Sequence, residues 1–348
     1  MFPAFVSSFC FLPPASCLLA VLLPHMAIFV LTRLARGLLI VFLTTTLTFF
    51  LIHAAPGEPL SGLLEDPRMT AEMRDAQRAR YGLDQPLGVQ YVRFLGNVAT
   101  GNLGESFTYR RPVIDVLRDA VPRTLLLMST ALLLGFAAGI VLGALQGAHA
   151  GAWFDRLSGG AAVLVASLPD FWLALIVLLL FAGTWRLFPV SGMSDPTMSP
   201  SAPLATRALD VMRHLVLPAG TLALLIGAIV SRYQRAALIE ALPNLWTRTA
   251  RAKGVPARRV IFRHALRNAV LPVITLGGLA VPALLGGAVF IEVTFTWNGM
   301  GSLAVQAVGN RDYSLVLAIV LLSSAFVVAG AILADLAQAV ADPRLRDA

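Results

Sequence analysis

Six long apolar runs constrain this chain more than any other feature of its sequence. A helix that crosses the hydrocarbon core of a bilayer needs about 20 consecutive apolar residues, so each run predicts a transmembrane helix. The fourth run is shorter than the others. We expect an all-α polytopic membrane protein with six transmembrane helices, at residues 37–54, 124–146, 159–183, 215–230, 269–291 and 313–340.

The composition excludes the main alternatives to a membrane protein. Of the 348 residues, 57% are hydrophobic and 13% are charged, whereas a soluble domain carries about 25% charged residues. The mean hydropathy of +0.77 is too high for an intrinsically disordered chain. Two cysteines cannot build a disulfide scaffold, and no short repeat indicates a collagen-like or coiled-coil rod.

The distribution of positive charge predicts the orientation in the membrane. Nearly all of the 27 positive side chains are arginine, and Lys253 is the single lysine. With the N-terminus inside, 14 of these charges fall in cytoplasmic segments and four in the two short outer loops. Because short loops rich in Lys and Arg stay in the cytoplasm, we expect both termini to be cytoplasmic. We attribute the net charge of +8 to the cytoplasmic loops that set the topology, and we therefore expect no nucleic-acid partner.

Residues 1–25 fit this scheme poorly. They contain Cys10, Cys17 and a helix-breaking pair of prolines, but no Lys or Arg for the basic region of a signal peptide. We expect translation to begin at Met26, with an extra apolar segment as the alternative, and no function for either cysteine. The expected organisation is a start-site extension at 1–25, the first segment and span at 26–54, an external segment at 55–123, and a transmembrane core at 124–346 that includes an inner loop at 231–268.

The polar segment 56–123 is predicted to fold outside the bilayer as a small cap of helices. Thr70 is placed to cap a helix that carries Glu72 in its first turn, and Gly82 to end it in the left-handed conformation. Apolar residues at helical spacing predict a second helix at 89–98. From composition alone, this cap is as readily scaffolding as a docking surface for a soluble partner.

The inner loop, residues 231–268, carries nine positive charges and one acid, Glu240. We expect it to form two helices. The first, at 236–253, is kinked or interrupted at Pro243, and Gly254 supplies the turn at its C-terminus.

The second helix of the inner loop is predicted at 257–268, with Pro256 in its first turn. It sets Arg259, Arg263 and Arg267 four residues apart on one face. Small side chains at the turn allow close backbone approach, so such a hairpin is suited to a groove of another protein. A basic helix is equally suited to lie on the membrane and hold anionic lipid headgroups, and the residue pattern leaves both open.

Several motifs, in order along the chain, carry a family resemblance. Residues 247–254 read TRTARAKG and are followed by HALRNA at 264–269 and by Pro272. They resemble the cytoplasmic EAA loop of the binding-protein-dependent ABC importer permeases of the dipeptide, oligopeptide and nickel class. The resemblance covers residues 26–346, although the EAA triplet reads RTA here. Other matching motifs are APGEP at 55–59, GLDQP at 82–86, GNLGES at 101–106, RPV at 111–113, LPDFW at 168–172, PVSG at 189–192 and DPR at 342–344.

The resemblance implies a transport subunit in the bacterial inner membrane. The turn at 250–254 would be the coupling helix that seats in a cleft of a cytoplasmic ATPase, with Gly254 at the position of the family's glycine. The residues that the resemblance assigns to ATPase coupling are Glu240, Thr249, Ala250, Arg251, Ala252, Lys253 and Gly254.

Partners and a substrate class also follow from the resemblance. It implies two cytoplasmic ATP-binding subunits and an external substrate-binding protein, within membrane lipid. It further implies a second permease subunit, which we expect to be a different chain, so that the pair is a heterodimer; a homodimer is the alternative. Peptides are the first expected substrate, with nickel chelates, glutathione or oligosaccharides as alternatives.

The chain itself lacks the motifs of bond chemistry. No G-x-x-x-x-G-K-[ST] loop is present to bind ATP, and neither H-E-x-x-H nor G-x-S-x-G occurs. The five histidines are scattered. We expect no catalytic residue, cofactor or metal site in this chain, and ATP hydrolysis on a separate subunit. We expect Trp172, Trp185 and Trp297 to be interfacial anchors rather than a cofactor cage.

An ion-coupled secondary transporter is the main rival interpretation, because such proteins carry acidic residues within the membrane. Glu292 and Asp335 lie near the ends of their spans, where they can be solvated or paired. Asp170 lies inside the third span, where the family often has a small residue. We therefore take Asp170, Phe171 and Trp172 as pathway candidates. Many secondary transporters contain an inverted repeat, and the hydropathy profile of this chain shows no sign of one.

Overall fold

The computed structural model describes residues 14–56, 70, 72, 73, 75, 76, 79, 82–199, 201–280, 284 and 288–341, with side chains between residues 31 and 334. Cys10, the DPR motif and the side chain of Asp335 lie outside this description. Apart from one two-stranded hairpin, the regular structure of the described residues is helical, in agreement with the all-α membrane class.

Four helices are long and apolar enough to cross a bilayer, and a bent helix pair makes a fifth if it counts as one span. The four correspond to predicted spans one, two, four and six, but the helices of spans one, two and four extend well beyond the predicted bounds. Pro122 and Pro218 lie inside the helices of spans two and four without ending them. The four helices are α1 (Pro14–Ala54), α5 (Val113–Ala148), α8 (Leu204–Ala241) and α16 (Tyr313–Ala341).

The third span is not the single helix that its apolar run predicts. It consists of α6 (Trp153–Ser167), α7 (Asp170–Val177) and a π-helical continuation, η1 (Leu178–Thr184). The two parts meet at an angle of 110°. Pro169 explains the break, because its ring forces the preceding residue out of the helical region and it has no N–H to donate. Leu168 is accordingly extended, with φ −81° and ψ 139°.

The fifth span also differs from its prediction. In place of one helix at 269–291, α12 (Leu271–Ala280) is followed by α14 (Val289–Thr294). Ala288, directly before α14, lies outside the helical region, with φ −101° and ψ 75°. A further helix, α15 (Met300–Gly309), precedes α16 and was not predicted.

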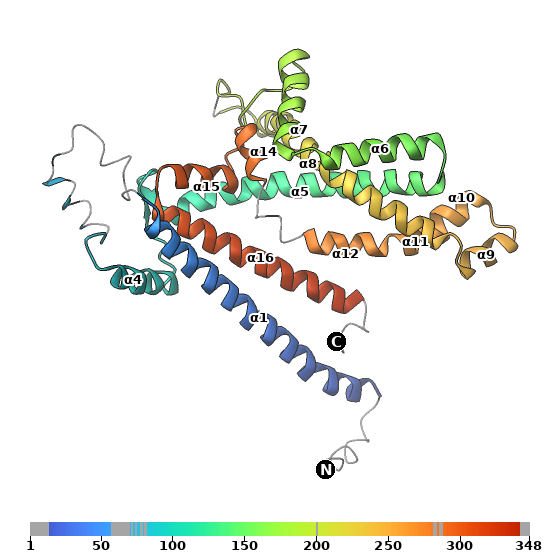
Figure 1. The fold of residues 1–348 in the computed structure, drawn as a ribbon, viewed down its shortest axis with the longest axis horizontal. Helices are drawn as coiled ribbons and strands as arrows, with labels where there is room; N and C mark the ends of the chain where they lie inside the picture. The colour runs from blue at the N-terminus through green and yellow to red at the C-terminus, as the bar shows by residue number, and fades with distance from the viewer. Residues whose placement is uncertain are drawn as a thin grey trace, which may run out of the picture.

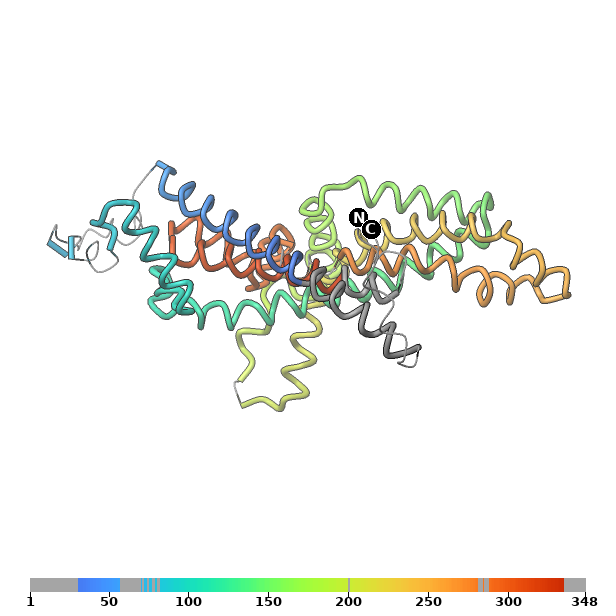
Figure 2. The backbone as a smooth tube through the Cα atoms, turned by 90° about the horizontal axis from the view of Figure 1, so that it is seen from below, coloured from blue at the N-terminus to red at the C-terminus, as the bar shows by residue number. Residues whose placement is uncertain are grey.

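The molecule is elongated, and its two ends differ in character (Figures 1 and 2). At one end, α1 meets α4 (Leu87–Ala99) and the β-hairpin. At the other end, the long helices α5 and α8 lead into the short helices that follow α8. Helix α1 lies beside α16 in both views. Segments far apart in the chain thus form two helical groups, one with α1 and α16 and the other with α8, and α5 contacts both.

The segment between α1 and α5 contains the predicted cap. The Thr70 hydroxyl accepts a hydrogen bond from the Met73 amide at 3.3 Å, as a helix N-cap does. Gly82 has φ +68°, which confirms the predicted left-handed turn. Helix α4 confirms the helix predicted at 89–98. The antiparallel pair β1 (Glu105–Ser106) and β2 (Arg111–Pro112) was not predicted.

Asp312 ties this hairpin to the start of α16. Its buried carboxylate accepts hydrogen bonds from the Ser106 hydroxyl at 2.5 Å and the Thr108 amide at 3.0 Å. The other oxygen accepts from the Leu315 amide at 3.2 Å, so Asp312 also caps α16. A buried carboxylate with three donors is satisfied, and it fixes the hairpin on the helix.

Helices α5 and α8 pack together along a row of glycines. Gly135, Gly139, Gly143 and Gly147 recur every four residues on α5 and face α8. A Cβ added at Gly139 would lie 2.6 Å from the Cβ of Val230, well inside van der Waals contact. Small residues at this spacing let two membrane helices approach closely, which makes the α5–α8 pair the structural centre of the molecule.

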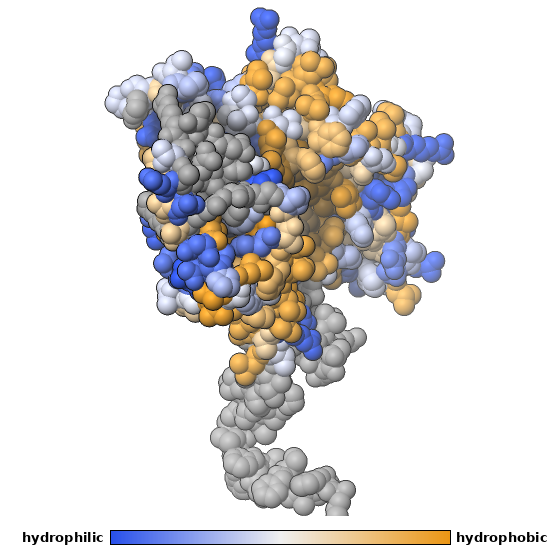
Figure 3. Space-filling model, turned by 60° about the vertical axis from the view of Figure 1, so that its left-hand side comes forward, coloured by the Kyte–Doolittle hydropathy of each residue, from blue (hydrophilic) through white to orange (hydrophobic). Residues whose placement is uncertain are grey.

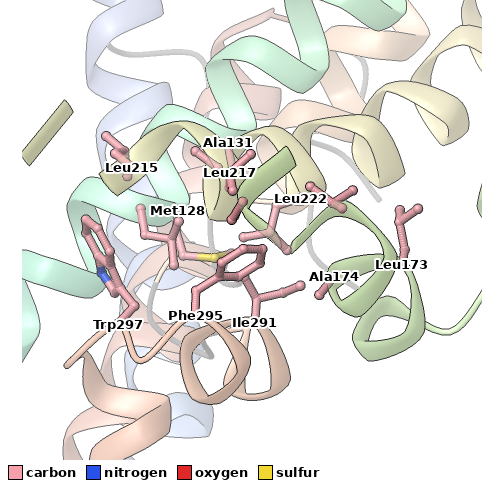
Figure 4. Close-up of a cluster of buried hydrophobic side chains, with 14 residues drawn as sticks. Met128, Ala131, Leu173, Ala174, Leu215, Leu217, Leu222, Ile291, Phe295 and Trp297 are labelled. Carbon is pink, nitrogen blue, oxygen red and sulfur yellow. The ribbon is translucent and has the colours of Figure 1, made fainter. Parts of the chain in front are cut away.

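Hydrophobic side chains from α5, α7, α8 and α14 form the largest buried cluster (Figure 4). Met128, Leu222 and Ile291 lie at its centre, beside Phe295 and Trp297. Large hydrophobic areas remain open on the surface (Figure 3). They fit a surface that faces lipid, and their strongly exposed members include Leu38, Leu133 and Leu179.

Candidate functional site

The inner loop forms a helical hairpin at the end of α8. Helix α8 continues to Ala241, and α9 (Leu245–Ala252) begins after a break that contains Pro243, which confirms the predicted interruption. The buried Thr247 hydroxyl donates toward the carbonyls of Leu242 and Asn244, at 2.7 and 2.6 Å. The Asn244 carbonyl also accepts from the amides of Thr247 and Arg248, both at 3.1 Å, so the bend between α8 and α9 has a defined geometry.

The turn at Gly254 has the geometry of a Schellman motif. The Gly254 amide donates to the Arg251 carbonyl at 2.9 Å, and the Val255 amide donates to the Ala250 carbonyl at 3.2 Å. Gly254 has φ +74°, a conformation that favours glycine. No atom lies within 4 Å of an added Cβ, so the glycine is needed for its backbone and not for close packing within this chain.

The second arm of the hairpin is a distorted helix. It begins at α10 (Ala257–Arg259), directly after Pro256, and continues as the π-helical η2 (Val260–Ala265) and as α11 (Leu266–Ala269). The π-helical turn breaks the four-residue spacing expected for the arginines, because its hydrogen bonds span five residues. Those side chains are exposed; they are Arg259, Arg263 and Arg267.

The hairpin is anchored to the membrane helices by a small buried cluster. Ala265 and Ala269 from the second arm pack against Leu238 and Ala241 of α8 and Ala144 of α5. All five are nearly inaccessible to solvent. Since the anchoring contacts are made through alanines, the arm approaches α8 closely and packs against both α8 and α5.

Most of the predicted coupling residues lie on the surface. Ala250 is buried, at 8% exposure, and faces the interior of the hairpin. Two surface residues were missed by sequence reasoning: Leu245 and Trp246, at the start of α9, are 78% and 47% exposed. Their sequence signal is that two large apolar residues begin a helix whose other residues are small, polar or basic. The exposed coupling residues are Glu240, Thr249, Arg251, Ala252, Lys253 and Gly254.

The pathway candidates lie where α6 bends into α7. Asp170 occupies the first turn of α7, and its carboxylate accepts a hydrogen bond from the Phe171 amide at 2.8 Å. A carboxylate at a helix N-terminus is stabilised by the helix dipole, which gives Asp170 a structural reason to be charged. Phe171 and Trp172 are 44% and 45% exposed. The Phe171 ring lies 6.0 Å from that of Phe290.

Glu292 is neither solvated nor paired with a basic residue in the described structure. Its side chain is fully buried and accepts hydrogen bonds from the Thr124 hydroxyl at 2.7 Å and the amides of Gly301 and Ser302 at 2.8 and 3.0 Å. The latter two amides belong to the first turn of α15. Glu292 is therefore a buried cap that joins α5, α14 and α15.

Trp297 corrects another expectation. It was predicted to be an interfacial anchor, but it is fully buried, and its indole N–H donates to the Arg123 carbonyl at 2.9 Å. Trp185, by contrast, is 56% exposed and Trp172 45%, as interfacial positions allow. Trp297 and Glu292 thus belong to the same buried junction rather than to a membrane surface.

The loop between η1 and α8 has its own ordering contacts. Asp195 accepts hydrogen bonds from the Thr197 hydroxyl and amide, at 2.7 and 2.8 Å. These two bonds, the hydroxyl above all, hold the pKa of the Asp195 carboxyl below its usual value. No group of three His, Cys, Asp or Glu side chains suited to a metal ion occurs among the described residues.

Family models match nearly the whole chain. The model described as "Binding-protein-dependent transport system inner membrane component" matches residues 135–347. The model for the N-terminal part of this membrane component matches residues 26–128. The chain therefore belongs to the family of inner membrane permease subunits of binding-protein-dependent transport systems, and it is a multi-pass protein of the bacterial inner membrane.

Three relatives match over nine-tenths of the chain. The oligopeptide transport system permease protein AppB of Bacillus subtilis is 35% identical over 321 residues, 92% of this chain and 99% of the relative. The di/tripeptide transport system permease protein DppB of Pseudomonas aeruginosa is 37% identical over 330 residues, 91% of this chain and 98% of the relative. The glutathione transport system permease protein GsiC of Escherichia coli is 33% identical over 318 residues, with the same coverage.

Proposed function

We propose that this chain is the membrane-spanning subunit of an ATP-driven peptide importer, forming half of the translocation pathway. Similarity along the full length to peptide permeases carries this proposal. The names of these relatives favour peptides over nickel. An external binding protein delivers the peptide, two cytoplasmic ATP-binding subunits supply the energy, and a second, different permease subunit completes the pathway.

The orientation follows from the charge distribution. The hairpin end carries nine positive charges between residues 232 and 267 and lies in the cytoplasm. The β-hairpin and α4, at the opposite end of the molecule, lie outside (Figure 2). Six membrane crossings place both termini in the cytoplasm when the bent third segment and the broken fifth segment each cross once.

The hairpin is the contact with the ATP-binding subunit. Leu245 and Trp246 supply an exposed apolar surface, and Arg248, Arg251 and Lys253 surround it with positive charge. An apolar centre with charged surroundings is the usual anatomy of a protein interface. Because α9 rests on the second arm, and that arm on α8, closure of the ATP-binding subunits moves α8 and α5 as a rigid unit.

Transport by matched glycine variants tests the coupling role. In proteoliposomes with the whole transporter, Gly254→Leu should retain assembly but lose most ATP-driven peptide uptake. The control is Gly151→Leu, because Gly151 in the turn between α5 and α6 also has a positive φ, +83°, and no atom within 4 Å of an added Cβ. Both substitutions strain the backbone by about 1–2 kcal/mol. Equal uptake by the two variants would refute the coupling assignment.

Asp170 separates this proposal from an ion-coupled transporter. In an ATP-driven permease its side chain only accepts the hydrogen bond from the Phe171 amide in the first turn of α7, so Asp170→Asn should preserve most ATP-driven uptake, because the amide oxygen of Asn also accepts this bond. In a proton or ion relay, removal of the charge abolishes coupling. Uptake driven by an ion gradient without ATP, and lost in Asp170→Asn, would contradict the proposal.

The bend that carries Asp170, Phe171 and Trp172 faces the pathway between the two permease subunits. The support is the exposure of both aromatic side chains at a break in a membrane-spanning segment. Phe171→Cys and Trp172→Cys should react with a water-soluble thiol reagent, and transported peptide should protect them. Leu179→Cys, on the exposed side of η1, is the control and should react poorly. Equal reactivity at all three positions would reject a pathway at this bend.

A further inference from the structure

A cavity of about 670 Å³ opens between α6 and α8, away from the pathway candidates. Its lining combines three arginines, one buried acid, Asp155, and apolar side chains. Arg156 lies in the first turn of α6, and Arg232 and Arg235 lie in the last third of α8. Gln146, from the end of α5, completes the lining next to the turn that joins α5 to α6.

Two of the three arginines in the cavity are available to a ligand. Arg235 is committed to the buried Asp155, whose carboxylate it binds through two hydrogen bonds of 2.5 and 2.8 Å. Arg156 and Arg232 are exposed, and within the described residues neither forms an ion pair with an acidic side chain. Three arginines thus face one acid, Asp155, in the cavity lining, and the net positive charge favours an anionic ligand.

Most of the apolar lining lies on the side of the arginines away from the hairpin end. On α6, Gly159, Gly160 and Val163 follow Arg156, and Val163 lies seven residues, or about 10 Å, further along the helix. On α8, Ile229 precedes Arg232 by almost one turn and is 46% exposed. Along the chain, α6 runs away from the hairpin end and α8 runs toward it. Both helices therefore carry their arginines near the hairpin end, and Val163 and Ile229 lie deeper.

Aromatic residues mark the depth of the charged end. Trp153 is the first residue of α6 and is 74% exposed, and Tyr233, which lines the cavity, is 55% exposed. Exposed Trp and Tyr collect at the level of lipid headgroups. The charged end of the cavity therefore lies at the headgroup level of one leaflet, and the apolar end lies in its hydrocarbon.

We propose that this cavity binds an anionic phospholipid of the cytoplasmic leaflet. Its phosphate contacts Arg156 and Arg232, and the first part of an acyl chain lies over the two glycines and between Val163 and Ile229. The assignment of the leaflet rests on the orientation given under the proposed function. Basic pockets between membrane helices on the cytoplasmic side are suited to such headgroups.

Phosphatidylglycerol is the probe of choice, because its headgroup carries the negative charge that the arginines favour, whereas phosphatidylcholine is neutral overall. Gln146 does not select the headgroup: it is buried, it donates from its amide nitrogen to the Ser158 hydroxyl at 3.0 Å, and its carbonyl oxygen is enclosed by protein atoms.

Native mass spectrometry of the whole transporter, titrated with phosphatidylglycerol or phosphatidylcholine in mild detergent, tests the site. The double variant Arg156→Gln with Arg232→Gln should weaken phosphatidylglycerol binding about thirtyfold, or about 2 kcal/mol, since each arginine near an anionic lipid contributes about 1 kcal/mol. Binding of phosphatidylcholine should not change. Arg156→Lys with Arg232→Lys keeps the charge and should restore most of the affinity. The control is Arg207→Gln with Arg213→Gln, which removes two exposed charges of the same helix, α8, outside the cavity and should leave binding unchanged.

Three results would overturn the proposal. The first is equal phosphatidylglycerol affinity in the parent and the Arg156/Arg232 double variant. The second is displacement of the bound species by inorganic phosphate, which would make the cavity a site for a free anion. The third is loss of the second permease subunit from the double variant with lipid retention unchanged, which would make the cavity a subunit interface. None of these readouts depends on ATP-driven uptake, so failure of the lipid site is distinguishable from failure of the transport proposal.

Discussion

The glycine row of α5 makes a quantitative prediction about stability. Gly139 lies opposite α8, and a Cβ at this position would lie 2.6 Å from the Cβ and 2.7 Å from the Cγ1 of Val230. It would also lie 3.0 Å from the backbone carbonyl oxygen of Gly227. Since one of these neighbours is backbone, Gly139→Ala must push the two helices apart rather than rotate one side chain.

The expected magnitude comes from two opposing effects. Alanine is a better helix former than glycine by about 1 kcal/mol, and this gain is available at any helical glycine. Overpacking a tight interface costs about 1–3 kcal/mol. Gly220 provides the matched control, because it lies in α8 with no atom within 4 Å of an added Cβ. Gly220→Ala should therefore be neutral or stabilising, and Gly139→Ala should be less stable than Gly220→Ala by about 1–3 kcal/mol.

The assay is the apparent melting temperature of each variant in one detergent, followed by the loss of monodisperse protein on heating. For a chain of 348 residues, 1 kcal/mol corresponds to about 1.4 °C, so the two variants should differ by about 1–4 °C. Gly139→Ala together with Gly143→Ala should lower the melting temperature further, because both lie on the same contact. Identical melting temperatures for Gly139→Ala and Gly220→Ala would refute the close α5–α8 contact.

Two further stability predictions concern buried charges. Asp155→Asn leaves Arg235 without its carboxylate and should destabilise the protein by about 1–3 kcal/mol, less than for a fully buried pair because Arg235 is partly exposed. The control, Asp115→Asn at the exposed pair with Arg118, should change stability by less than about 1 kcal/mol. Equal melting temperatures for the two variants would contradict this prediction. Glu292→Gln puts an amide donor among three donors and should cost about 1–3 kcal/mol. A Glu292→Gln protein as heat-stable as the parent would show that the junction does not depend on this carboxylate.

Local turn chemistry explains which parts of the fold were predictable. Gly254 and Gly82 stand where helices end in the left-handed conformation, and Pro243 stands where a helix is interrupted. Each effect depends on residues within a few positions in the chain. The hairpin and the cap helix α4 could therefore be predicted from the sequence, whereas the π-helical η2 could not, because it depends on how the second arm fits α8.

Long-range packing explains what sequence reasoning missed. Thr124 and Glu292 are 168 residues apart, and Ser106 and Asp312 are 206 residues apart, so no local pattern pairs them. The burial of Trp297 has the same origin, because tryptophan in a junction and tryptophan at a membrane surface look alike in a sequence. The break at Pro169 had a local signal, but the surrounding apolar run outweighed it in the prediction of a single span.

Photo-crosslinking from α9 tests the central claim, that this hairpin contacts the ATP-binding subunit. In a chain with Cys10→Ser and Cys17→Ser, Thr249→Cys carries a benzophenone on the exposed surface of α9. Thr100→Cys, exposed after the end of α4 at the opposite end of the molecule, is the control. Illumination of the intact transporter should link the Thr249 position to an ATP-binding subunit and leave the Thr100 position unlinked to it. An intact assembly in which Thr249 links to no ATP-binding subunit would contradict the account.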